Sequence, residues 1–205
     1  MGRGKFIIVE GLDGAGKGTA IEGLKKHFGK QIHFTHEPGA TPLGAVLRPL
    51  TKTVATDSLT HFFLFLADRR EHVETVIAPT LKRGTHVVCD RSFGSSYAYQ
   101  LVAGGLAVSD EIFRTLHKSI FGDSLPDAWI YVSVSPEVAA ARLLARRTDR
   151  DHFETLEYQR RVAKGYEQFF NHYQPEGTVH RVKNDGSIGE LQKATVALVE
   201  DVIGA

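Results

Sequence analysis

Residues 11–19, which read GLDGAGKGT, combine residue types and a spacing that suit phosphate chemistry. They follow a short apolar run and precede a stretch whose apolar residues share one helical face. Glycines let successive backbone N–H groups turn toward a phosphate, and the start of a helix adds the positive end of its dipole. The pattern predicts a P-loop that binds ATP, with Lys17 neutralising the β- and γ-phosphates. The expected members are Gly11, Gly14, Ala15, Gly16, Lys17, Gly18 and Thr19.

The alternative for this segment is a glycine-rich turn without a ligand, which the spacing, the lysine and the strand–helix context all oppose. Gly18 stands where a P-loop usually offers a serine or threonine hydroxyl to Mg²⁺, and Thr19 comes one place later. We therefore expect Mg²⁺ to be bound through water and carboxylates, with Asp13 and Asp90 as the candidates. For Asp90 the alternatives are the orientation of Arg91 and a structural salt bridge.

Two pairs of side chains, each four residues apart, suit recognition of a nucleobase. Phe65 and Arg69 share a helical face, so a ring can stack on a base while a guanidinium donates to a base carbonyl. Thymine O4 would accept from Arg69, whereas the amino group of cytosine would not. Ser96 and Gln100 also share a face and can reach the base edge. The alternative place for Phe65 is the hydrophobic core. We expect the core to hold Phe62, Phe63 and Leu66.

Short apolar runs alternate with helical stretches along the chain, which is typical of a parallel sheet. Strands are expected at residues 5–10, 32–36, 86–90, 128–134 and 179–182. Helices are expected at about 17–28, 43–47, 57–76, 95–102, 109–120, 135–147 and 154–173, and after a capping box formed by Ser187 and Glu190. Pro79 is expected to kink or end the helix before it. The prediction is a single α/β domain over residues 1–205, with a doubly wound five-stranded parallel sheet and helices on both faces.

Composition excludes several classes of protein. Among 205 residues the formal net charge is +1, so no overall field attracts nucleic acid. Cys89 is the single cysteine, which excludes an internal disulfide and a cysteine-only metal cluster. The apolar run at 6–9 soon meets Glu10, so it resembles neither a signal peptide nor a membrane span. These features predict a cytoplasmic enzyme or binding module.

Several further segments carry a resemblance to one family. Residues 35–39 (THEPG) with Arg48, residues 65–72 (FLADRREH) and residues 90–100 (DRSFGSSYAYQ) are similar to segments of bacterial thymidylate kinases. These enzymes are P-loop nucleoside monophosphate kinases, and the related adenylate kinases also read Gly-Lys-Gly-Thr in the loop. The similarity continues through residues 127–137 and the basic stretch before Phe153, so it spans nearly the whole chain.

The resemblance implies transfer of the γ-phosphoryl group of ATP to dTMP, with ADP and dTDP as products. It places Arg91 on the acceptor phosphate, Tyr99 under the deoxyribose and Asp13 near the sugar 3′-hydroxyl or the metal. A plain helical aromatic is the alternative for Tyr99, and Tyr97 is expected to be structural. The implied substrate-binding residues are Asp13, Glu37, Arg48, Phe65, Arg69, Arg91, Ser96, Tyr99 and Gln100. His36 replaces an arginine that the family commonly has.

Basic residues before Phe153 resemble the lid of this family. The lid is expected at about residues 146–153, where Arg146 and Arg150 would neutralise the phosphoryl group in transfer. Arg142 would pack on adenine, beside a loop at 184–186. A solvated basic helix end is the alternative interpretation. The predicted catalytic residues are Lys17, Arg91, Arg146, Arg150 and Asp13.

The predicted ligands are ATP as co-substrate, dTMP and Mg²⁺, without nucleic-acid or membrane partners. The family also implies a homodimer, for which the aromatic segment Phe62–Phe63 offers a face. A kinase for another acceptor and a nucleotide-binding regulator are the competing hypotheses.

Overall fold

The fold is built on a parallel sheet of five strands in the order β2-β3-β1-β4-β5. The structure is a computed structural model that describes residues 2–53, 57–145 and 155–204. The strands are β1 (Phe6–Glu10), β2 (Ile32–His36), β3 (His86–Asp90), β4 (Ala128–Ser133) and β5 (Thr178–Lys183). Each predicted strand is present, with ends within one residue of the prediction. The predicted fold class is therefore confirmed.

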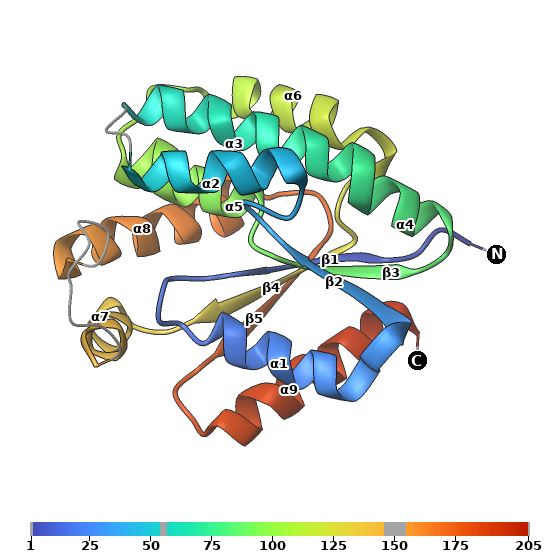
Figure 1. Cartoon of the computed structure of the whole chain (residues 1–205). Coiled ribbons are helices and arrows are strands. Elements are labelled where there is room, and N and C mark those ends of the chain that lie inside the picture. The colour runs from blue at the N-terminus through green and yellow to red at the C-terminus, as the bar shows by residue number, and fades with distance from the viewer. Residues whose placement is uncertain (1, 54–56, 146–154, 205) are drawn as a thin grey trace.

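Helices cover both faces of this sheet (Figure 1). Helices α1 (Lys17–Phe28) and α9 (Ile188–Ile203) pack together on one face. The opposite face carries α2 (Pro42–Thr53), α3 (Ser58–His72), α4 (Ala78–Lys82), α5 (Phe93–Ser96), α6 (Asp110–Phe121) and α8 (Leu156–Gln168). Helix α7 (Pro136–Leu144) follows β4 beside the end of the sheet. In the described part of the chain, no helix is long and apolar enough to cross a membrane.

Strand β1 lies at the centre and is buried along its whole length. It pairs with β3 through Val9 and Asp90 and with β4 through Glu10 and Tyr131. The chain leaves β1 toward β2 on one side and later reaches β4 on the other, so the connections diverge at the carboxyl end of β1. Ligands of doubly wound sheets bind at such a divergence.

Side chains cap the starts of several helices. Asp57 accepts hydrogen bonds from the first N–H groups of α3, and Ser135 accepts one at the start of α7. Ser187 and Glu190 form the predicted capping box at the start of α9. These caps determine where the three helices begin.

Pro79, which was predicted to kink or end its helix, does not end the helical run. Helix α3 continues through a π-helical segment, Val73–Ile77, directly into α4. The N–H of Ala78 bonds the carbonyl of Val73, five residues back, which shifts the hydrogen-bond pattern just before the proline. The missing N–H of Pro79 then falls in the first turn of α4, where a proline is tolerated.

Two other helical stretches also contain π-helical segments. The stretch expected at 95–102 is α5 followed by a π segment, Tyr97–Ala103, and α8 ends in a π segment, Phe169–Tyr173. Phe63 is 57% exposed, so its predicted core position is wrong, while Phe62 and Leu66 are buried as predicted. Successive helical residues differ by about 100° around the axis, so Phe63 turns outward when Phe62 turns inward.

Candidate active site

The predicted P-loop connects β1 to α1 and has the backbone that its glycines allow. Gly14 and Gly16 have φ angles of 82° and 101°, which favour glycine. A Cβ atom on Gly14 would come within 2.6 Å of the Ala139 carbonyl oxygen, and one on Gly16 would collide with the Asn184 side chain. The loop therefore requires glycine at both positions. The N-cap residue of α1 is Gly16, which has no side chain to cap the helix. The first N–H groups of α1 are therefore left without a side-chain cap at the loop.

Lys17 begins α1 and folds back over the loop. Its buried Nζ donates to the carbonyl oxygens of Gly11 at 2.9 Å and Leu12 at 3.0 Å. Burial and then the positive charge of Arg91 lower the pKa of Lys17 to about 8, although nearby carboxylates oppose the shift. These opposing carboxylates belong to Asp13, Asp90 and Glu10.

Residues from the other end of the chain brace the same loop. The Nδ2 of Asn184 donates to the Ala15 carbonyl oxygen at 2.6 Å. Arg142 on α7 donates to the carbonyl oxygens of Gly14 and Asn184. The predicted adenine-side residues thus lie beside the P-loop. Gly18 is exposed with open space around it, and Thr19 is half-buried behind it.

Arg91 faces the P-loop across the end of the sheet. Its guanidinium donates to the carboxylate of Asp13, inside the loop, and to Ser95 Oγ at 2.9 Å. Tyr99 donates to the other Asp13 oxygen at 3.0 Å, and its ring lies 5.3 Å from the Arg91 guanidinium carbon. Burial opposes ionisation of Asp13, but Arg91 and Lys17 hold its pKa well below the usual range. These hydrogen bonds of Asp13 therefore connect the P-loop to Arg91 and Tyr99 on the opposite side of the site.

Arg91 has a φ angle of 69°, which is uncommon for a residue other than glycine. Its N–H bonds the carbonyl oxygen of Val9 at the end of β1, which fixes this backbone. The guanidinium also donates to Tyr166 on α8 at 3.2 Å. Contacts from β1, α5 and α8 together aim the arginine at the P-loop.

Glu10 at the end of β1 is a residue of the site that no sequence motif indicated. It is fully buried and accepts hydrogen bonds from the N–H groups of Ser92 and Ser95, the Ser95 hydroxyl and the Tyr166 hydroxyl. Burial raises the pKa of Glu10 despite Arg91 and these donors. Its position after a buried apolar run, directly before the P-loop, was the signal that could have identified it.

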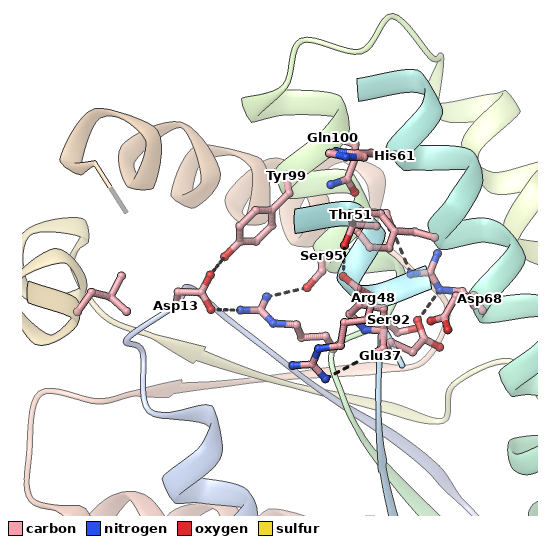
Figure 2. Close-up of a pocket in the computed structure, with 16 residues that line it drawn as sticks. Asp13, Glu37, Arg48, Thr51, His61, Asp68, Ser92, Ser95, Tyr99 and Gln100 are labelled. Atoms are coloured by element: carbon pink, nitrogen blue, oxygen red, sulfur yellow. Dashed lines mark hydrogen bonds and ion pairs between the residues drawn. The ribbon is translucent and has the colours of Figure 1, made fainter. Parts of the chain in front are cut away.

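A cavity of about 350 Å³ opens beside Asp13, between α3, α5 and the loop after β2 (Figure 2). Figure 2 shows Tyr99 pointing toward Asp13, and Gln100 and His61 also line the cavity. Every substrate-binding residue predicted from the sequence lines this cavity. These residues are Asp13, Glu37, Arg48, Phe65, Arg69, Arg91, Ser96, Tyr99 and Gln100.

Other residues of the wall were not predicted to bind substrate. They include Pro38, Thr51, His61, Asp68, Ser92, Ser95 and Leu143. His61 lies four residues before Phe65 on the same face of α3, and that spacing could have identified it. Leu143 reaches the wall from α7, for which the sequence carried no signal.

Arg69 lies in the wall, but its guanidinium is bound within the protein. Its Nε donates to Glu37 at 2.7 Å, one terminal nitrogen to Ser96 at 3.2 Å, and the other lies 3.1 Å from His117 Nε2. The Arg69 and Glu37 side chains are only 3% and 4% exposed, so this ion pair is almost dry. Arg48 in contrast is exposed and donates to the Pro38 carbonyl oxygen.

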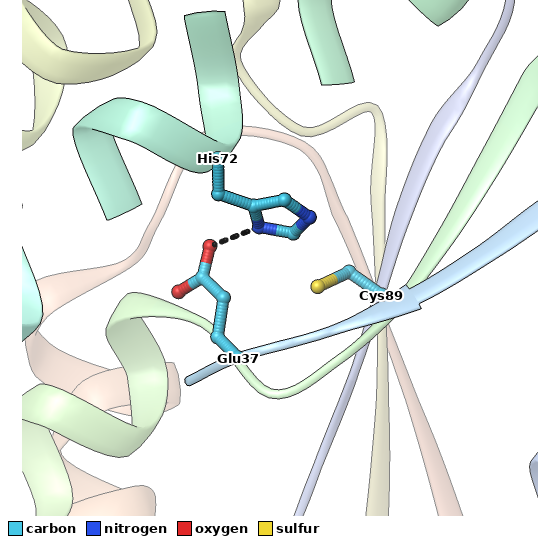
Figure 3. A group of neighbouring side chains, drawn as sticks. All are labelled: Glu37, His72 and Cys89. Carbon is cyan, nitrogen blue, oxygen red and sulfur yellow. Dashed lines mark hydrogen bonds and ion pairs between the residues drawn. The ribbon is translucent and has the colours of Figure 1, made fainter. Parts of the chain in front are cut away.

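Glu37, which binds Arg69, forms a buried cluster with His72 and Cys89 (Figure 3). Their potential ligand atoms lie within 4.8 Å of one another, which would suit a metal ion. However, His72 Nδ1 bonds Glu37 at 3.2 Å, and its Nε2 bonds the Thr35 hydroxyl at 2.7 Å. The second Glu37 oxygen binds Arg69, and burial raises the pKa of the Cys89 thiol, so the thiolate is disfavoured. Hydrogen bonds therefore account for the cluster.

His36, which replaces the family's common arginine, is exposed and lies outside the set of residues that line the cavity. Tyr97 is buried and donates to Asp110 at 2.9 Å, which confirms its structural place. Arg146, Arg150 and the lid expected at 146–153 lie in a stretch that the structure does not describe.

Known proteins match both the sequence and this fold. The family model described as thymidylate kinase matches residues 9–194. A thymidylate kinase of Paracidovorax citrulli is 40% identical over 174 residues, covering 80% of this chain and 79% of the relative. A thymidylate kinase of Symbiobacterium thermophilum is 37% identical over 204 residues, covering 97% of this chain and 94% of the relative.

A solved structure supports the same fold. The crystal structure of thymidylate kinase from Ehrlichia chaffeensis superposes with a TM-score of 0.75 at 24% identity, covering 96% of this chain and 99% of that one. The family model spans the segments that form the P-loop and the cavity wall, from Glu10 through Asn184. The chain therefore belongs to the thymidylate kinase family.

Proposed function

We propose that this protein transfers the γ-phosphoryl group of ATP to dTMP, giving ADP and dTDP. The observation that supports this proposal most strongly is the contact between Asp13 in the P-loop and Arg91 beside the cavity. It means that a phosphate cradle and a pocket of nucleotide size share one wall. The names of the relatives point to the same reaction.

The donor side of the proposal is the P-loop. Its backbone N–H groups and Lys17 would bind the phosphates of ATP, and Arg142 would contact adenine. The predicted lid residues Arg146 and Arg150 would neutralise the phosphoryl group while it moves. Lid closure would also exclude water, which otherwise competes as the acceptor.

The acceptor side is the cavity. Arg91 would bind the dTMP phosphate with a planar pair of donors, supported by Arg48. Phe65 would stack on the thymine ring, and Tyr99 would lie under the deoxyribose. Arg69, Ser96 and Gln100 would contact the base edge.

The chemical step needs little from the protein beyond placement and charge. The acceptor phosphate is already nucleophilic near neutral pH, so in-line transfer needs no strong general base. Lys17 and the arginines would stabilise the negative charge that spreads over the transferring oxygens. Asp13 would help place the acceptor through its contact with Arg91.

Mg²⁺ is part of the proposal, and the residues present fit it. The Oδ1 atom of Asp90 is buried without a hydrogen-bond partner in the described part of the chain, and its carboxylate lies close enough to affect the pKa of Lys17. Asp13 offers a second carboxylate, and Mg²⁺ prefers such oxygen ligands. Bound there, the ion would neutralise phosphate charge. The open space at Gly18 agrees with coordination through water and carboxylates.

The remaining predictions complete the proposal. A single domain over residues 1–205 fits one continuous sheet, and the near-neutral charge fits small-molecule substrates better than nucleic acid. A cytoplasmic location follows from where ATP and dTMP are used. We also propose that two copies of the chain form a homodimer.

The experiment is a coupled assay for ADP with purified protein, ATP and MgCl₂, run across dTMP, dUMP, dCMP, dGMP and thymidine. We expect dTMP to give the highest kcat/KM and little ADP without an acceptor. Product dTDP is identified by chromatography. Absence of dTDP from a folded sample would refute the proposal, and a preference for another acceptor would reassign it.

A further inference from the structure

His117 on α6 is a buried histidine that the proposed mechanism does not use. It is 1% exposed and lies 3.1 Å from a terminal nitrogen of Arg69. The two residues are 48 apart in the sequence and belong to different helices. Nothing in the sequence pattern pairs them, so packing of α6 against α3 creates the contact.

The hydrogen bonds of the ring determine which nitrogen carries the proton. Nδ1 lies 2.7 Å from the carbonyl oxygen of Phe113, which can only accept, so Nδ1 must donate. Nε2 faces an arginine N–H, which can only donate, so Nε2 must accept. His117 is therefore a neutral imidazole, and the lone pair of its Nε2 accepts a hydrogen bond from Arg69. Burial and the Arg69 charge agree, because both hold the pKa of His117 well below its usual range.

Aromatic neighbours hold this imidazole in place. The Phe113 ring centroid lies 4.1 Å from that of His117, and the Phe93 ring stacks on it at 4.8 Å. Phe93 and Phe113 are both fully buried. The acceptor that meets Arg69 therefore belongs to a rigid part of the core.

Three acceptors now fix the Arg69 guanidinium, one at each nitrogen: Glu37 at Nε, Ser96 and His117 at the two ends. A guanidinium has five N–H groups. Among the described residues, one N–H on each terminal nitrogen is left for a ligand. Because the plane is fixed at three points, the direction of these two N–H groups is fixed as well.

We propose that His117 is a positioning residue for base recognition, which holds Arg69 so that its free N–H groups meet a carbonyl-bearing pyrimidine edge. The inference rests on the proposed function, since it assumes that the base lies against Arg69. Thymine and uracil present O4 there, whereas cytosine presents an amino group that cannot accept. Without the His117 acceptor, the guanidinium can rotate about the Glu37 contact and loses this discrimination.

The test compares His117→Leu, which removes the acceptor, with His117→Gln, whose Oε1 can replace Nε2. Phe121→Leu is the matched control, because Phe121 is a buried residue of the same helix without a hydrogen bond to Arg69. For each folded variant, kcat/KM is measured with dTMP and dUMP, and inhibition constants are measured for dCMP. If His117→Leu does not fold, His117→Met serves as the apolar variant.

In His117→Leu we expect kcat/KM for dTMP and for dUMP to fall together by about tenfold, mainly through KM, as when a charged group loses a hydrogen-bond partner. Inhibition by dCMP should not weaken, so the preference for dTMP over dCMP should fall by about the same factor. His117→Gln should regain most of the preference, and Phe121→Leu should retain it.

Equal losses for dTMP, dUMP and dCMP would show a merely structural role and overturn the inference. Unchanged kinetics in His117→Leu would overturn it as well. Failure of the wild-type protein to phosphorylate dTMP would instead refute the proposed function, so the two failures are distinguishable.

Discussion

Lys17 is the central side chain of the proposed ATP site, and its surroundings make its charge sensitive to pH. Lys17 is 7% exposed, and its ammonium interacts with the charges of Arg91, Asp13, Asp90 and Glu10. Burial and Arg91 disfavour the charged form more than the carboxylates favour it, which is why the pKa falls to about 8. Bound phosphates would add negative charge and favour the ammonium again.

This balance predicts an alkaline limb in the kinetics of ATP. Below pH 8 the free protein carries a charged Lys17, and above it the charge is lost, so kcat/KM for ATP should fall as pH rises through about 8. At pH 9 about one tenth should remain, since each further unit costs a factor of ten. The profile is measured from pH 6 to 10 with dTMP well below its KM.

The control is Lys17→Arg, in which the guanidinium keeps its charge across this range. That variant should be slower but should lack the limb near pH 8. In the wild-type protein, kcat should persist to higher pH than kcat/KM, because bound ATP stabilises the ammonium. A wild-type kcat/KM that stays level to pH 9.5 would contradict the assignment.

At the scale of elements, the carboxylate of Glu10 helps to attach residues 93–103 to the sheet. Glu10 on β1 binds the N–H groups of Ser92 and Ser95, which open α5, and the hydroxyl of Tyr166 on α8. Residues 93–103, which carry Ser96, Tyr99 and Gln100, thus start from a point fixed by β1. Three elements meet at Glu10 where the sequence suggested only a strand end.

We therefore expect Glu10→Ala to displace residues 93–103 from their position against β1. Loss of the carboxylate leaves buried N–H groups unpaired, which should lower the free energy of unfolding by about 3 kcal/mol. KM for dTMP should rise more than KM for ATP, because Arg91 and Tyr99 follow the displaced turn. Urea denaturation and steady-state kinetics measure the two effects.

Glu10→Gln is the comparison, since its carbonyl can still accept from both N–H groups while its amide donates to the hydroxyls. It should lose about 1 kcal/mol and keep most of the affinity for dTMP. Equal behaviour of Glu10→Ala and the wild-type protein would mean that α5 is held by other contacts.

Elements whose signal is local were predictable from the sequence. The five strands, the P-loop and the helical pairs Phe65–Arg69 and Ser96–Gln100 follow from runs, glycines and spacing. The π-helical segments did not, because a shift from four to five residues in the hydrogen-bond pattern depends on packing rather than propensity. The contacts of Glu10 and of His117 with Arg69 join distant parts of the chain, and only the folded arrangement reveals them.

At the scale of the whole molecule, several large apolar side chains are exposed on the helices α2 and α3. Leu43, Val46 and Leu50 recur at helical spacing on α2, and Leu59 and Phe63 do so on α3. Helices α2 and α3 pack side by side on the outer surface (Figure 1), so their exposed side chains can form one patch. Phe63, which was predicted to lie in the core, is therefore an exposed part of this candidate interface.

We expect this patch to bury itself against a second copy, giving a homodimer of about 45 kDa from chains of 22.6 kDa. Phe63→Glu places a charge where the interface would be dry, and should shift the protein to monomers at micromolar concentration. Ile188→Glu is the control, because Ile188 is 66% exposed on α9, which covers the opposite face of the sheet. Light scattering coupled to size exclusion gives the masses. A monomeric wild-type protein, or a Phe63→Glu variant that remains dimeric, would exclude this face as the interface. If Phe63→Glu is monomeric, its kinetics with dTMP show whether the cavity wall formed by α3 depends on the partner.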